Sequence, residues 1–404
     1  MISTTNLPDT ETITSFVSRI LRIDDITSGT AKQNFLIRYR GQLYSDPISS
    51  YNSLTKDLYQ YGCTPLFREE GKEHVILIVE GSLKPKASNP LVNLFLFTLT
   101  LFSMVFAGAM YTYNGPVPTE VNGFLATIFK SLPSGIPFAA SLLAILLAHE
   151  FGHYIAGRLH KTHVTLPYFI PFPFSPFGTM GAFIQLKEPP RNRRVLLDIG
   201  IAGPIAGFIV AIPILLYGLS ISYIDTINLA PGQGLQLEGN SILYLVAKYL
   251  VFGQFLPSPM DYGGISPLYY WVRYFFTSQP LPIGGLDVLI SPVAWAGWAG
   301  LLVTALNLIP AGQLDGGHVI YTLIGKKARL LLPIVLIILI LLGFAWSGWW
   351  IWAVLILLLG RVYAEPLDQI TKLNTGRKIL ALAGLVIFLL VFTPVPLVQT
   401  FMGP

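Results

Sequence analysis

The sequence predicts a polytopic α-helical membrane protein with about seven transmembrane helices and a small α+β soluble domain at its N-terminus. Two observations predict this class. Of the 404 residues, 53% are hydrophobic and only 12% are charged, whereas about a quarter of the residues in soluble domains are charged. The polar sequence is concentrated near the N-terminus, and the long apolar segments follow it. We therefore expect a soluble domain over residues 1–86 and a transmembrane domain over residues 87–404.

The first 86 residues contain short helical and strand-like patterns. Apolar residues recur at helical spacing from Thr10 to Ile23, and a second helix fits Ser49 to Tyr61. Phe35 to Tyr44 and His74 to Val79 alternate or run apolar in the manner of strands. His74 has no partner at metal-ligand spacing, so it is expected to be a surface or edge residue. These patterns predict a compact α+β module without a chemical motif.

Seven later segments are apolar enough, and about long enough, to be predicted as spans. They are Leu91–Met110, Ile136–Leu159, Val195–Leu219, Pro292–Ile309, Leu330–Trp346, Trp349–Tyr363 and Ile379–Leu397. The fifth and sixth are divided at Ser347-Gly348, because a single helix over residues 330–363 would be about 51 Å long, against a hydrocarbon core of about 30 Å. Two shorter apolar stretches, Val121 to Leu132 and Ser241 to Phe255, are expected to lie at the outer interface.

The distribution of charge predicts the orientation of the chain. With the N-terminus inside, most cations near the spans lie on inside flanks, and the outside loops hold Lys130, Lys248 and Arg273. We therefore expect a cytoplasmic N-terminus and an external C-terminus. The chain has 26 Lys and Arg residues but 21 Asp and Glu residues. Membrane topology accounts for this excess of cations, so no nucleic-acid partner is expected. The single cysteine, Cys63, excludes an internal disulfide framework.

The stretch His149-Glu150-Phe151-Gly152-His153 lies inside the second predicted span. Two histidines four residues apart lie on one face of a helix and can bind one zinc ion, and the glutamate between them can act as a general base. The alternative, two ordinary helix histidines and a surface carboxylate, requires a solvated face, but the preceding turns are apolar. Ionisable groups inside a membrane are costly and are typically functional, which favours the metal site.

A catalytic zinc usually has three protein ligands and one position open for water, so a third ligand is required. His160 lies roughly 10 Å along the helix from the second histidine of the motif and cannot complete the site. His163 follows in a loop and is expected at the surface. Asp198 and Asp315 are the carboxylates at comparable depth. The sequence favours Asp315, because the two glycines after it allow close backbone approach beside a cavity.

Two stretches resemble the signatures of the site-2 protease family. Residues 307–318, with the sequence NLIPAGQLDGGH, match the second signature, and HEFGH with residues 154–158 matches the first. The resemblance covers about residues 136–325 and leaves residues 326–404 as extra C-terminal helices. It implies Zn²⁺ bound by His149, His153 and Asp315, with Glu150 as the base. The N-terminal domain is similar to that of the chloroplast and cyanobacterial branch, so we expect a multi-pass protein of a prokaryotic cell membrane or a thylakoid-type membrane.

The resemblance also implies a substrate-binding region. Asn307 is expected to help hold the substrate, and Gly178, Gly181, Ala182 and Phe183 lie in a stretch that looks like the family's substrate-pairing strand. A helix in lipid has its peptide groups bonded internally, so cleavage requires local unwinding, and an added strand can bond the exposed groups. Residues 167–176 are rich in Pro and Phe, which fits either a loop dipping into the interface or an ordinary aromatic belt.

The sequence therefore predicts a zinc-dependent intramembrane endopeptidase whose partners are transmembrane protein substrates and membrane lipid. One alternative, a metal-handling carrier, would need further ligands along the spans, and the first, fifth and seventh have none. The other, a catalytically silent membrane scaffold, is disfavoured by the intact Glu150. Gly203 and Gly207 are spaced as in GxxxG and are expected to mark close packing of the third span, with no part in the chemistry.

Overall fold

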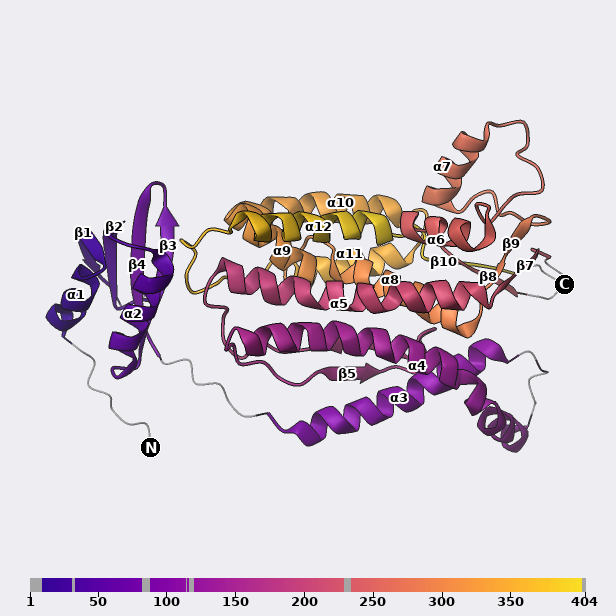
Figure 1. Cartoon of the computed structure of the whole chain (residues 1–404), viewed down its shortest axis with the longest axis horizontal. Helices are drawn as coiled ribbons and strands as arrows, with labels where there is room; N and C mark the ends of the chain where they lie inside the picture. Colours follow the sequence, from indigo (N-terminus) through magenta and orange to yellow (C-terminus); the bar gives the residue numbers. More distant parts are fainter. Residues whose placement is uncertain are drawn as a thin grey trace.

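The computed structural model describes residues 9–30, 33–81, 88–113, 115, 120–228 and 234–401. Helices make up most of the described chain, and its largest sheet lies near the N-terminus. Figure 1 shows an elongated bundle from α3 to α12, with the N-terminal sheet at one end and α7 with short strands at the other. The two ends of the bundle therefore differ in structure.

Residues 10–80 form a sheet of four antiparallel strands with two helices, which we call the N-terminal module. Its elements are α1 (Thr10–Ser18), β1 (Leu21–Ser28), β2 (Ile37–Leu43), α2 (Pro47–Tyr59), β3 (Cys63–Glu70) and β4 (Glu73–Glu80). The strand order is β1-β2-β4-β3, so β3 is at an edge of the sheet. The predictions of α2, β2 and β4 are confirmed. The predicted helix from Thr10 to Ile23 is wrong after Ser18, because Leu21 pairs with Leu43 in the sheet and is fully buried there.

Ten helices and a 3₁₀ segment follow among the described residues. They are α3 (Pro90–Thr112), α4 (Val121–Leu159), α5 (Arg193–Ser220), α6 (Ile242–Phe252), α7 (Pro267–Thr277), α8 (Pro292–Asn307), α9 (Asp315–Ile324), η1 (Gly325–Leu331), α10 (Leu332–Leu342), α11 (Gly348–Leu359) and α12 (Thr375–Val391). Three helical segments, Pro90–Thr112, Ala126–Leu159 and Arg193–Ser220, are long and apolar enough to cross a membrane. The other four predicted spans correspond to helices of 11 to 17 residues.

Helix α4 is longer than the sequence predicts. It runs for 39 residues through Pro133 and Pro137, so the stretch from Val121 to Leu132 is continuous with the helix of the second predicted span. Proline is tolerated in membrane helices where neighbouring elements support the freed backbone groups. Gly135 gives α4 its close approach to α3, because a Cβ atom at this position would lie 2.0 Å from the Val105 carbonyl oxygen.

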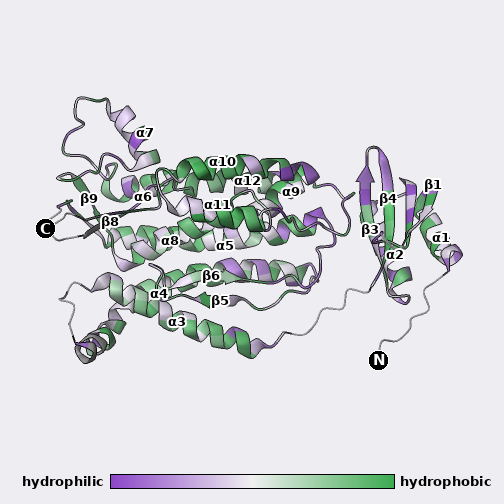
Figure 2. Ribbon diagram, turned by 180° about the vertical axis from the view of Figure 1, so that it is seen from behind, coloured by the Kyte–Doolittle hydropathy of each residue, from purple (hydrophilic) through white to green (hydrophobic). Residues whose placement is uncertain are grey.

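The remaining strands form three two-stranded sheets. They pair β5 (Tyr168–Pro171) with β6 (Thr179–Phe183), β7 (Tyr223–Thr226) with β9 (Leu286–Leu289), and β8 (Gly234–Glu238) with β10 (Leu397–Phe401). Part of the predicted Pro- and Phe-rich loop is therefore strand β5. Figure 2 shows β5 and β6 beside α3 and α4. The Asn93 side-chain amide of α3 holds this hairpin, since it donates to the carbonyl oxygens of Leu166 and Pro167.

Helices α4, α5 and α8 form the centre of the bundle and position the residues described below. Glycines permit their close packing. A Cβ atom at Gly297 of α8 would lie 2.7 Å from the Leu215 Cα of α5, and one at Gly152 of α4 would lie 2.5 Å from the Ala202 carbonyl oxygen of α5. Buried Trp295 of α8 adds a large apolar side chain to the same core. Small residues at helix contacts are typical of membrane proteins, where packing drives association.

Leu54 of α2 tests the core of the N-terminal module. It is 1% exposed, so Leu54→Ala should cost about 2–5 kcal/mol of module stability. Hydrogen exchange at the β3 and β4 amides of the full chain should accelerate accordingly. Tyr59→Ala is the matched control, because Tyr59 lies on the same helix and is 68% exposed. Equal effects of the two substitutions would contradict this assignment of the core.

Candidate metal centre

Three ligand atoms from two helices meet in the middle of the bundle. His149 and His153 lie on α4, and Asp315 is the first residue of α9. The two histidine Nε2 atoms are 3.2 Å apart, and each lies 3.3 Å from Asp315 Oδ2. Zinc bonds of about 2.0–2.1 Å at tetrahedral angles separate ligand atoms by about 3.3–3.4 Å. The triangle therefore has the dimensions of three corners of a tetrahedral zinc site.

The protonation of the ligands supports a cation at this position. His153 Nδ1 lies 2.7 Å from the Ile199 carbonyl oxygen, which can only accept, so Nδ1 donates and Nε2 carries a lone pair in the neutral ring. This lone pair faces Asp315 Oδ2, a second acceptor. Both histidines are buried, so water cannot screen their contact with the carboxylate. A bound cation relieves the repulsion between these acceptors, and the residues present fit zinc.

Two glycines of α5 make room for the histidine rings. A Cβ atom at Gly203 would lie 2.1 Å from His153 Nε2, and one at Gly207 would lie 3.1 Å from the His149 Cβ. The expectation that these glycines mark close packing is confirmed, and the atoms against which they pack belong to the two histidines. Their i, i+4 spacing matches that of the two histidines because α4 and α5 pack along each other.

Glu150 and Asn307 lie beside the three ligands. Both line a cavity of about 210 Å³ that also includes His149, His153 and Asp315. Asn307 Nδ2 is 3.3 Å from His149 Nε2, and Glu150 Oε2 has no hydrogen-bond partner among the described residues. A carboxylate oxygen without a partner, on a residue that lines a cavity, is available to accept a proton from a water molecule.

The expected substrate-pairing strand reaches the cavity at its C-terminal end. Ala182, Phe183 and the following Ile184 line it, whereas neither Gly178 nor Gly181 is among its described lining residues. A Cβ atom at Gly178 would lie 2.4 Å from the Ser103 carbonyl oxygen, so this glycine packs against α3. Within the described sheet, β6 pairs with β5 alone. One edge of β6 therefore remains open to a further strand.

The competing ligands lie elsewhere. Asp198 Oδ2 is 2.6 Å from Arg377 Nη2 and 2.9 Å from His160 Nε2, so it joins α5 to α12 and to the end of α4. His163 is exposed and lies 3.0 Å from Glu188. His74 lies in β4, where its Nδ1 accepts a hydrogen bond from the Leu43 amide. The exclusion of His160 and the preference for Asp315 over Asp198 agree with this geometry.

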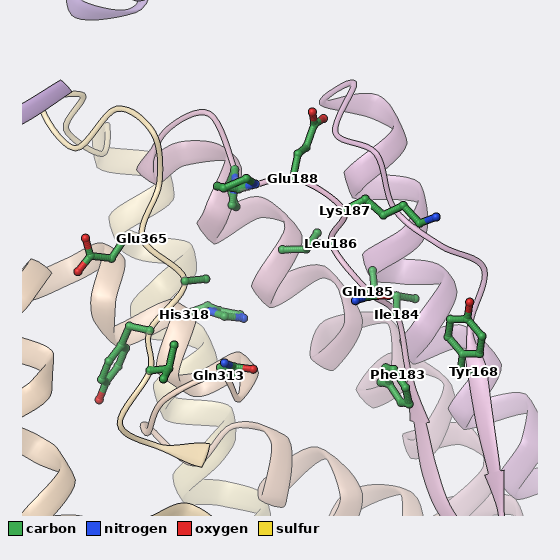
Figure 3. A pocket seen from close by; sticks show the side chains of 15 residues that line it. Tyr168, Phe183, Ile184, Gln185, Leu186, Lys187, Glu188, Gln313, His318 and Glu365 are labelled. Atoms are coloured by element: carbon green, nitrogen blue, oxygen red, sulfur yellow. The ribbon is translucent and has the colours of Figure 1, made fainter. Parts of the chain in front are cut away.

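His318 lies one helical turn after Asp315, and no spacing in the sequence predicts a role for it. Its ring lines both the 210 Å³ cavity and a larger pocket of about 830 Å³ beside it, and its Nδ1 is buried without a hydrogen-bond partner in the described chain. Figure 3 shows His318 and Gln313 across the pocket from the segment that runs from Phe183 to Glu188. The spacing of three residues from Asp315 is the signal that places His318 on the same helix face.

Gly203→Ala tests the space required by the ligand rings. The added methyl group would overlap His153 Nε2, so the variant should lose most of its bound zinc, measured by elemental analysis of purified protein. Gly376→Ala is the control, because a Cβ atom at Gly376 meets nothing within 4 Å. Full zinc content in the Gly203 variant would contradict the geometry of the site.

Asp315→Ala and Asp198→Ala separate the two carboxylates. Asp315→Ala should remove most of the zinc, because it deletes one corner of the triangle. Asp198→Ala should keep the zinc but lower the thermal unfolding temperature, because Arg377 and His160 lose their common partner. Metal analysis and thermal unfolding of the same samples measure both effects, and the reverse pattern would assign Asp198 as the ligand.

Comparison with known proteins supports the interpretation of the site. Probable zinc metalloprotease EGY1, chloroplastic, from Arabidopsis thaliana is 29% identical over 340 residues, covering 78% of this chain and 56% of that protein. Probable zinc metalloprotease EGY2, chloroplastic, from Oryza sativa subsp. indica is 28% identical over 369 residues, covering 89% of this chain and 62% of that protein. The chain thus spans less than two thirds of the length of these relatives. No solved structure matches significantly.

A family match covers the residues that build the metal centre. The sequence profile of Peptidase family M50 matches residues 137–345, which is more than half of the chain and includes both stretches that resemble the site-2 protease signatures. The matched region contains HEFGH, the β5–β6 hairpin and Asp315. The chain therefore belongs to peptidase family M50.

Proposed function

We propose that the chain is a zinc-dependent endopeptidase that cleaves transmembrane segments of membrane proteins. The observation that carries this proposal is the triangle of two histidine nitrogens and one carboxylate oxygen, with Glu150 on the same cavity. The names of the EGY relatives, which describe them as probable zinc metalloproteases, support the same activity. His149, His153 and Asp315 would hold the metal.

The residues around the metal divide the chemistry between them. Zinc bound there would polarise the scissile carbonyl and lower the pKa of a water molecule. Glu150 would accept the proton of the attacking water and deliver it to the leaving amine, since the residue lines the cavity and its Oε2 has no hydrogen-bond partner in the described chain. Asn307 would orient the substrate, because its side-chain amide lies 3.3 Å from His149 Nε2. The apolar surroundings would keep bulk water from these groups.

We propose that the substrate binds as a strand along β6. Peptide groups exposed by unwinding a helix in lipid need new partners, and an open strand edge provides them. The edge of β6 ends at Phe183, beside the cavity that holds Glu150. Ala182 and Phe183 would therefore contact the residues next to the scissile bond. Gly178 would act through packing on α3, and Gly181, with a φ of 100°, would provide a backbone conformation that other residues rarely adopt.

We further propose a domain division at residue 86 and seven spans with a cytoplasmic N-terminus. Three helices have the length of spans. The turn between α10 and α11 reaches the far end of α12, since Trp349 Nε1 donates to the Pro394 carbonyl, and this contact supports a hairpin that crosses the bilayer. The protein would reside in a prokaryotic cell membrane or a thylakoid-type membrane, in contact with lipid and with its substrates.

Two observations argue against the alternative functions. A metal-handling carrier needs a series of sites, whereas the described residues contain one cluster of three potential ligands. A silent scaffold has no need for a buried carboxylate with an unpartnered oxygen, because burying Glu150 costs stability unless the group has a function. Peptide hydrolysis uses both the single cluster and the free carboxylate.

Glu150→Gln tests the proposed mechanism. The amide cannot accept a proton, so cleavage of a single-span model substrate in detergent should fall by about 100-fold or more. Zinc content should stay at the wild-type value, because Glu150 is outside the triangle. The readouts are cleavage by gel or mass spectrometry and metal analysis of the same sample. Cleavage at the wild-type rate, or cleavage that persists after chelation, would refute the mechanism.

A further inference from the structure

The segment that joins α11 to α12, residues 363–374, binds the edge of the N-terminal module. We call this segment the strap. The Phe67 amide of β3 donates to the Leu367 carbonyl (2.9 Å), and the Gln369 amide donates to the Phe67 carbonyl (3.0 Å). Arg68 Nη1 donates to the carbonyl oxygens of Pro366 and Leu367. The strap therefore extends the module's sheet at its edge strand.

The opposite side of the strap binds the segment that leads into α5. The Leu367 amide donates to the Pro190 carbonyl (3.0 Å), and the Asp368 amide donates to the Arg191 carbonyl (2.8 Å). Asp368 forms parallel bridges both to Phe67 and to Asn192. Residues 367–369 of the strap thus lie between the module and residues 190–192 and are hydrogen-bonded to both.

Apolar burial and a buried carboxylate reinforce this junction. Leu367 and Ile370 of the strap belong to the same hydrophobic cluster as Phe67 and the rest of the module core. Asp368 is 1% exposed and accepts hydrogen bonds from the backbone amides of Ile370 and Thr371. Burial raises the pKa of this carboxyl. Separation of the module would expose all of these groups to water.

The two segments that meet at the junction also form opposite walls of the 830 Å³ pocket. Glu188, Pro189 and Pro190 line one wall, and Tyr363, Ala364 and Glu365 line the other. Figure 3 shows Glu188 and Glu365 on different segments near the mouth and His318 deeper inside. His318 and Ile184 border both this pocket and the metal cavity. The hydrogen bonds that join the strap to the module and to residues 190–192 therefore also fix the two segments that line the pocket.

We propose that the N-terminal module controls access to the metal centre by clamping the strap. While the module is docked, its edge strand is hydrogen-bonded to the strap, and the strap is hydrogen-bonded to residues 190–192. These bonds keep the two walls of the pocket at a fixed separation. Release of the module frees the strap from one side and lets the walls move apart. This inference rests on the proposed function, because the pocket leads to the proposed catalytic cavity. Contacts of this kind within one chain are typically reversible, as a switch requires.

The test measures the separation of the walls directly. Cys63 is the only cysteine in the chain, so a Cys63→Ala background with Pro189→Cys and Ala364→Cys accepts two spin labels across the pocket. Leu367→Asp or Ile370→Asp places a charge in the junction and should release the module while leaving the module's own sequence unchanged. Lys372→Asp is the matched control, because Lys372 lies in the same strap and is exposed. Arg68→Ala weakens the junction without a buried charge.

We expect each releasing variant to accelerate hydrogen exchange at the Phe67 and Gln369 amides and to give a longer, broader distance distribution between positions 189 and 364. Cleavage efficiency should change by about fivefold or more, the usual scale of coupling between sites. The control should match wild type. Accelerated exchange with unchanged distances and cleavage would overturn the proposal. The zinc content of each variant verifies that its membrane part is intact. If wild type cleaves no substrate but the releasing variants still show the longer distance, the proposed function is refuted and the clamp is supported.

Discussion

The structure depends on the contact of three electron-pair donors inside a bundle of apolar helices. Two imidazole nitrogens and a carboxylate oxygen lie within 3.3 Å of one another, and such a contact is repulsive unless a proton or a metal ion lies between them. Their surroundings are fixed by packing, since α5 contributes glycine where the rings need space and the Ile199 carbonyl sets the tautomer of His153. A zinc ion bound to these three atoms would add its binding free energy to the stability of the folded chain.

The same packing explains how a peptide bond and water can reach a group buried in the bundle. The β5–β6 hairpin lies beside α3 and α4 and ends at the metal cavity, where it offers an open strand edge. The larger pocket borders this cavity from the side of the N-terminal module. Irregular backbone of this kind is tolerated at membrane depth where it lines a cavity. In the proposed mechanism, the hairpin and the pocket would provide separate approaches to the Glu150 carboxylate.

The strap links the larger pocket to the N-terminal module, a part of the chain that has no chemical motif. The N-terminal module contacts neither the metal ligands nor Glu150 through any described hydrogen bond or ion pair. Its edge strand instead binds the strap, and the strap binds the segment before α5. In the proposed mechanism, the module acts on access and leaves the chemistry of the site unchanged. An edge strand without a covering element is prone to pair with other chains, and the strap removes this risk as well.

The sequence by itself indicated the membrane class, the histidine pair with Glu150 between them and the preference for Asp315, because helical spacing, the burial of charge and the glycines after Asp315 are local features. It also placed α2, β2 and β4. Only the tertiary structure decided that α1 stops at Ser18. The apolar residues up to Ile23 fit a helix as well as a strand, and the pairing of Leu21 in the sheet favours the strand. The role of Gly203, the pairing of Asp198 with Arg377 and the position of the strap were also decided there. Each of these depends on contacts between segments far apart in the chain, which local spacing does not encode.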